Sequence, residues 1–145
     1  MKYGIFTKPV HVEKIVNYLN QNTDLDYIIS TSKNDVYAYD FDIGVSYCFQ
    51  ELLDVEYGDR KWFNYHPAPM KYPGVTNYVK PISDGVTKFG VTLHRMTAEF
   101  DKGEVVLFMS FKLKSKPVHH NELGNITHYY LFQLFKKTIS KLVEF

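Results

Sequence analysis

Four short apolar runs dominate the first half of the chain and restrict it to folds built around a buried sheet. They fall at residues 3–7, 26–31, 42–47 and 61–65. Between the first two runs, apolar residues recur at helical spacing, and Pro9 stands where the first turn of a helix tolerates proline. The apolar positions of this helix are Val12, Ile15, Val16 and Leu19. Continuous apolar strands alternating with helices are typical of α/β sheets that are parallel at their start.

The second half predicts a loop, two further strands and two helices. Three prolines and a glycine place residues 66–74 in a loop. Residues 76–84 predict a short helix that Pro81 would interrupt. Strands are expected at 90–96 and 104–113, and a helix from about residue 125. The apolar face of that last helix is Leu131, Leu134, Phe135, Ile139 and Leu142. We therefore expect one α/β domain over residues 1–145, an open, mostly parallel, Rossmann-like twisted sheet flanked by helices.

The amino-acid composition excludes several classes of protein. The 145 residues are 45% hydrophobic and 23% charged, which is ordinary for a globular domain and excludes disorder as the main state. The formal charge of +1 gives no bulk attraction to nucleic acid or to a membrane surface. A disulfide within the chain is impossible because Cys48 is the single cysteine. There is no signal-peptide pattern and no apolar run of ~20 residues, so a cytoplasmic protein is expected.

Asn64 and His66 are the first candidate catalytic residues. They stand two apart at the end of a predicted strand, so their side chains face the same side. In open α/β sheets, ligands bind beyond the carboxyl ends of the strands. An amide can hydrogen-bond a polarised oxygen, and an imidazole can move a proton near neutral pH. Taken alone, however, such a pair is more often an accident of loop composition, and Asp101 followed by Gly103 is usually only a turn.

The order of the separate motifs says more than each one. Asn64-x-His66 is followed by KYPG at 71–74, GVTLH at 90–94 and DKG at 101–103. This order resembles the folate-dependent formyltransferase family, most closely from residue 42 to about 107. Its members include glycinamide ribonucleotide formyltransferase, methionyl-tRNA formyltransferase, sugar N-formyltransferases and formyltetrahydrofolate deformylase.

The resemblance implies a catalytic triad of Asn64, His66 and Asp101, with N10-formyltetrahydrofolate as formyl donor. It implies a folate pocket walled by Phe49, Gln50, Glu51, Leu52, Leu53, Pro67, Ala68, Met96, Thr97, Ala98, Glu99 and Phe100. Family members usually carry more apolar or basic residues at Gln50 and Glu51. The expected acceptor contacts are Thr76, Asn77, Tyr78 and His94. No metal is expected.

Three departures from the family pattern bear on the acceptor. The phosphate-binding loop of the purine-pathway enzyme is replaced by TKPVH at 7–11, which disfavours glycinamide ribonucleotide. The stretch before residue 42 is short, so a strand-helix unit common in the family is expected to be missing and the N-terminal half truncated. No domain of the kind that binds tRNA is expected after the last helix.

The resemblance then leaves a small amine, foremost a nucleotide-linked amino sugar, as the acceptor. Two alternatives stay open: a formyltetrahydrofolate deformylase, in which water replaces the amine, and a non-catalytic relative that binds folate or a partner. A homodimer is one way to cover a sheet edge left by the missing unit.

Four histidines and the cysteine are set outside the predicted site. His11 and His128 are interpreted as helix-surface residues. Cys48 is interpreted as a buried, inert thiol because no basic residue is near it in sequence. Adjacent His119 and His120 predict a solvated loop rather than a metal site.

Overall fold

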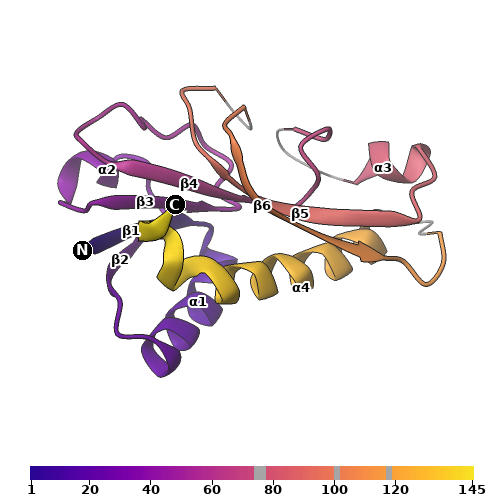
Figure 1. Ribbon diagram of the computed structural model, residues 1–145, viewed down its shortest axis with the longest axis horizontal. Coiled ribbons are helices and arrows are strands. Elements are labelled where there is room, and N and C mark those ends of the chain that lie inside the picture. The colour runs from indigo at the N-terminus through magenta and orange to yellow at the C-terminus, as the bar shows by residue number, and fades with distance from the viewer. Residues whose placement is uncertain (74–77, 100–101, 117–118) are drawn as a thin grey trace.

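A six-stranded sheet of order β2-β1-β3-β4-β5-β6 organises the fold (Figure 1). The computed structural model describes residues 1–73, 78–99, 102–116 and 119–145. The elements are β1 (Lys2–Thr7), α1 (Pro9–Asn22), β2 (Asp26–Ser30), α2 (Asp35–Ala38), β3 (Ile43–Tyr47), β4 (Lys61–His66), α3 (Val79–Ser83), β5 (Lys88–Arg95), β6 (Val105–Lys112), α4 (His120–Thr138) and a 3-10 helix, η1 (Ile139–Glu144). β1 to β4 pair in parallel, whereas β5 and β6 pair antiparallel. The predicted α/β class and the parallel start of the sheet are confirmed.

The main core lies between the sheet and two helices, α1 and α4, which Figure 1 shows on the same side of it. Along β4, Phe63 and Tyr65 point into this core, and Tyr65 meets the ring of Phe135 from α4 at a centroid distance of 5.2 Å. Because side chains alternate along a strand, Asn64 and His66 belong to the opposite face. The alternation therefore places Phe63 and Tyr65 in the main core and leaves Trp62 and the two polar residues for the other side.

A smaller core covers that opposite face. It consists of Phe6, Val36, Phe41, Phe49, Leu53 and Trp62. Gly44 permits this packing, because a Cβ added there would lie 2.3 Å from the Trp62 ring. Arg60 fastens the segment around α2 by donating to the carbonyls of Val36 and Tyr39 at 2.8 and 2.7 Å. The four-residue α2 is the single helix or strand between β2 and β3.

Several predicted boundaries need correction. α4 begins at His120, not near residue 125, and it ends at Thr138, so that Ile139 and Leu142 lie in η1. Pro81 does not interrupt α3, because it is the third residue of that helix, where its missing N–H costs no intrahelical bond. Of the described residues, no helix combines the length and apolar character needed to cross a bilayer.

Candidate active site

Asn64 and His66 lie beside a cavity of about 360 Å³ at the carboxyl ends of the parallel strands. Asn64 is half-buried, while His66 is only 2% exposed. His94, which is 1% exposed, reaches the same cavity from β5 because it pairs with Asn64 across the two strands. The structure therefore brings together two of the three predicted catalytic residues and one predicted acceptor contact. Asp101 lies outside the described residues.

The hydrogen bonds around Asn64 fix which way its amide points. The Nδ1 of His94 is 2.8 Å from the Arg95 carbonyl oxygen, which can only accept, so this nitrogen carries a hydrogen. In the neutral ring, the Nε2 of His94 is then an acceptor, and the Nδ2 of Asn64 donates to it at 3.1 Å. The Oδ1 of Asn64 is thereby turned away from His94. This role for His94 was not predicted, although its register opposite Asn64 could have indicated it.

The ring of His66 is held by a hydrogen bond at its Nε2 atom. Its Nε2 donates to the carbonyl oxygen of Tyr72 at 2.8 Å. Two side-chain bonds hold the intervening loop: Thr92 donates to the Ala68 carbonyl at 2.8 Å, and Tyr78 donates to the Pro67 carbonyl at 3.3 Å. A carbonyl acceptor at Nε2 keeps a hydrogen on that nitrogen and leaves Nδ1 as the nitrogen that differs between the neutral and charged forms.

The predicted folate walls fall largely on the cavity. Nine of the predicted residues line it: Phe49, Gln50, Glu51, Leu52, Leu53, Pro67, Met96, Thr97 and Glu99. Ala98 is exposed and Ala68 is fully buried, and neither lines the cavity. Phe100 lies outside the described residues. Apolar side chains with a few polar groups, in a volume of a few hundred Å³, are typical of a small-molecule site.

The four predicted acceptor contacts have different outcomes in the structure. Thr76 and Asn77 lie outside the described residues. Tyr78 is 6% exposed, does not line the cavity, and packs its ring 6.4 Å from that of His128. Tyr78 is the residue immediately before α3, and its backbone is left-handed with φ of 67°. Tyr78 supports the segment after His66 through its hydrogen bond to the Pro67 carbonyl. His94 is the one described residue of the four that reaches the cavity.

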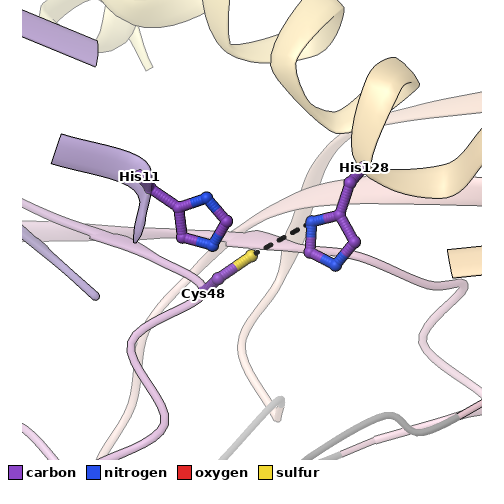
Figure 2. Close-up of side chains that lie close together, drawn as sticks. All are labelled: His11, Cys48 and His128. Carbon is purple, nitrogen blue, oxygen red and sulfur yellow. Dashed lines mark hydrogen bonds between the residues drawn. The ribbon is translucent and has the colours of Figure 1, made fainter. Parts of the chain in front are cut away.

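A second group of side chains lines the same cavity, and it corrects the interpretation of two histidines. His11, Cys48 and His128 come from α1, the residue after β3, and α4, and they point toward one another (Figure 2). The Sγ of Cys48 is 4.0 Å from the Nδ1 of His128. Neither histidine is an exposed surface residue, because both are half-buried. Sequence reasoning missed the group because its members are separated by 37 and 80 positions, that is 48−11 and 128−48.

Burial sets the ionisation of this second group. It lowers the pKa of His11 to about 4, with the charges of Lys14, His128 and Lys8 acting in the same direction. Burial also lowers the pKa of His128, and it raises the pKa of the Cys48 thiol to about 12. At neutral pH the three groups are therefore two neutral imidazoles and a thiol. The neighbouring Lys8 is bonded to Gln50 across the mouth of the cavity.

The structure resembles solved formyltransferases over nearly its full length. No protein-family model matches the sequence, and no curated protein does. An N-formyltransferase from Helicobacter canadensis, in complex with folinic acid and dTDP-3-aminofucose, matches 99% of this chain at 21% identity and a TM-score of 0.78. A 4-N formyltransferase from Francisella tularensis matches 99% of it at 17% identity and a TM-score of 0.78. Phosphoribosylglycinamide formyltransferase from Campylobacter jejuni matches 99% at 15% identity and a TM-score of 0.72.

The chain thus has the formyltransferase fold, as the order of its motifs predicted. Both sugar N-formyltransferases and phosphoribosylglycinamide formyltransferases share this architecture with it. The match covers 64% of the Helicobacter chain, 69% of the Francisella chain and 97% of the Campylobacter chain. This chain therefore spans somewhat less than two thirds of the Helicobacter enzyme.

Proposed function

We propose that the protein transfers a formyl group from N10-formyltetrahydrofolate to a small amine, foremost a nucleotide-linked amino sugar. The observation that carries the proposal is the placement of Asn64 and His66 on one cavity, at the strand ends, next to the predicted folate walls. Support also comes from the solved Helicobacter relative, which was crystallised with folinic acid and dTDP-3-aminofucose. The protein acts in the cytoplasm under this proposal.

In this reaction the bound donor supplies the formyl carbon, and the side chains stabilise the charge that develops as the amine adds. Asn64 would donate to the formyl oxygen from Nδ2, the group that also donates to His94. His66 would act through Nδ1, because its Nε2 is committed to the Tyr72 carbonyl. Asp101 would orient His66 and take or relay the amine proton. A hydrogen-bond donor of this kind typically contributes ~10²–10³ in rate.

The decisive experiment measures tetrahydrofolate release from N10-formyltetrahydrofolate, with and without a panel of nucleotide-linked amino sugars. Release that depends on one amine supports the transferase and names its acceptor class. Release without any amine would instead favour the deformylase. No release, combined with folate binding in a titration of the same sample, would favour the non-catalytic relative.

Point variants test the assignment of the triad. We expect His66→Ala, Asn64→Ala and Asp101→Asn to fold normally, and to lose about 10²-fold or more of the turnover. His120→Asn is the matched control, since His120 is exposed on the first turn of α4. Turnover within tenfold of the wild type in His66→Ala or Asp101→Asn would sink the assignment.

A further inference from the structure

We infer that His11, Cys48 and His128 form a binding site for a single Zn²⁺ ion, with one coordination position open to the cavity. The ligand atoms would be one imidazole nitrogen from each histidine and the Sγ of Cys48. Within the described part of the chain, these three atoms lie within 4.8 Å of one another. This inference stands apart from the proposed formyl transfer, which uses Asn64 and His66.

The distances suit a site that closes on a metal by small side-chain rotations. Zn²⁺ binds imidazole nitrogen at about 2.0–2.1 Å and thiolate sulfur at about 2.3 Å, so tetrahedral ligand atoms lie roughly 3.3–3.6 Å apart. The Sγ of Cys48 and the Nδ1 of His128 are already 4.0 Å apart. The two imidazole rings have centroids 5.8 Å apart and planes inclined by only 16°. Figure 2 shows a nitrogen of each ring on the side of the Cys48 sulfur, so side-chain rotations can bring both nitrogens toward one point beside it.

Three separate elements of the fold hold these ligands in place. His11 is the third residue of α1, whose start is set by Pro9. Cys48 has a left-handed backbone with φ of 53°, an uncommon conformation for a non-glycine residue. The residue before it is tied down, because Thr7 donates to the Tyr47 carbonyl at 2.6 Å. His128 belongs to the middle of α4, next to the fully buried Thr127. The positions of the ligands are thus fixed by the packed core rather than by a loose loop.

The donor set selects the metal. Imidazole and thiolate suit Zn²⁺, whereas Mg²⁺ and Ca²⁺ prefer oxygen ligands, of which this group has none. On binding, the Cys48 S–H bond breaks, a Zn–S bond forms, and the proton leaves to solvent. Lys8 and Lys14 are the charged groups facing the cluster, and the new thiolate offsets part of the positive charge that the ion adds. Because positively charged side chains face the site, Zn²⁺ binding must rely on the strength of its bonds to nitrogen and sulfur rather than on attraction to negative charge.

Three protein ligands leave a fourth tetrahedral position. Structural zinc sites are normally closed by four protein ligands, whereas sites that bind or activate another molecule keep one position for it. Because all three residues line the cavity that also contains Asn64 and His66, the fourth position is reached from that cavity. Its occupant is a water molecule or an oxygen or nitrogen atom of a molecule bound there.

The test uses Co²⁺ as a spectroscopic probe on the full chain, after chelator treatment under reducing conditions. We expect one equivalent of Co²⁺ to give a thiolate-to-metal charge-transfer band and the intense visible bands of a tetrahedral site. One equivalent of Zn²⁺ should remove both. Excess Zn²⁺ should raise the melting temperature, and chelator should reverse the rise. A wild-type protein that shows no charge-transfer band and no Zn²⁺-dependent shift would overturn the inference.

Variants separate the three-residue site from adventitious binding. Cys48→Ser should lose the charge-transfer band, and His11→Asn and His128→Asn should each weaken Zn²⁺ binding at least about tenfold. His120→Asn should leave affinity and spectrum unchanged, because His120 is exposed and belongs to no such cluster among the described residues. If Cys48→Ser does not fold, the two histidine variants decide alone. Unchanged affinity in both, or an equal loss in His120→Asn, would show binding outside the proposed site.

Discussion

Asn64 and His94 face each other across the antiparallel pairing of β4 and β5, with the Nδ2 of Asn64 donating to the Nε2 of His94 at 3.1 Å. Because the Nδ1 of His94 donates to the Arg95 carbonyl at 2.8 Å, its Nε2 is an acceptor in the neutral ring. The imidazole therefore favours the orientation of the Asn64 side chain in which Nδ2, rather than Oδ1, faces His94. In the proposed reaction His94 is a positioning residue that acts through Asn64.

The first prediction concerns His94→Leu, which removes the acceptor without adding polarity. We expect kcat for tetrahydrofolate release to fall about tenfold to a hundredfold, because the amide of Asn64 loses its orientation. Folate affinity should stay within about twofold, since the amide acts on charge that develops in the transition state. His94→Gln should recover part of kcat, because its Oε1 can accept the same bond. An unchanged kcat in His94→Leu would show that Asn64 is oriented by other contacts.

The second prediction uses pH to test the support of the His66 loop. The Oδ1 of Asp84 is 2.9 Å from the Nζ of Lys80, and its Oδ2 accepts from the Tyr72 hydroxyl at 2.7 Å. These hydrogen bonds lower the pKa of Asp84 below its ordinary value of 3.8. Tyr72 in turn supplies the carbonyl that accepts from His66. The carboxylate therefore stabilises the folded loop that holds the imidazole.

The direction in which stability changes with pH follows from the lowered pKa of Asp84. A carboxyl group with a lowered folded-state pKa stabilises the protein above its unfolded pKa, and this contribution is lost as the pH falls through the folded value. We expect Asp84→Asn to be less stable than the wild type in urea denaturation at pH 7. The difference should shrink only once the pH falls below 3.8. Lys80→Gln should show the same trend, and a difference that does not vary with pH would contradict the prediction.

The third prediction compares two buried tyrosines. Tyr47 and Tyr65 are both fully buried. The hydroxyl of Tyr65 is 2.7 Å from the Oγ1 of Thr138, whereas that of Tyr47 has no hydrogen-bond partner within the described residues. A buried polar group without a partner costs about 1–3 kcal/mol, and a typical satisfied hydrogen bond contributes about 1 kcal/mol. Removing the two hydroxyls should therefore have opposite effects.

We expect Tyr47→Phe to raise the free energy of unfolding by about 1 kcal/mol and Tyr65→Phe to lower it by a similar amount. Urea denaturation of both variants beside the wild type measures this directly. Each variant deletes the same atom from a fully buried ring, so each serves as the control for the other. Equal losses of stability would mean that the Tyr47 hydroxyl does have a partner in solution.

The strands and the placement of Asn64 and His66 were predictable, because both rest on local rules. The alternation of side chains along β4 assigns Phe63 and Tyr65 to one face and the two polar residues to the other. The proline of α3 misled for a local reason as well. The predicted helix over 76–84 places Pro81 in its interior, whereas α3 begins only at Val79, and the first turn needs no N–H from this proline.

The start of α4 and the second cluster were not predictable from local pattern. Gly124 weakens the helical signal near the start of α4, yet it is buried there against the Tyr78 ring, which an added Cβ would approach to 3.1 Å. The meeting of His11, Cys48 and His128 depends on how α1 and α4 pack on the same side of the sheet (Figure 1). Periodicity shows which residues of a helix are polar, but it does not show which residues of another helix they meet.

The last prediction concerns Gly103, which closes the connection between β5 and β6. A Cβ added there would lie 1.5 Å from the carbonyl oxygen of Arg95, so the backbone must move to accommodate any side chain. The pairing beside it is tight, with the Arg95 N–H donating to the Glu104 carbonyl at 2.8 Å. Since Asp101 precedes this glycine by two residues, displacement of the backbone should disturb the third member of the proposed triad.

We expect Gly103→Ala to lower the free energy of unfolding by roughly 1–3 kcal/mol, as overpacking against backbone does. Its kcat for tetrahydrofolate release should fall further than the fraction of folded protein does. Lys102→Ala is the control, because Lys102 is the exposed neighbour in the same connection. A Gly103→Ala protein that loses stability but keeps its kcat per folded molecule would contradict the prediction and show that Gly103 affects stability alone.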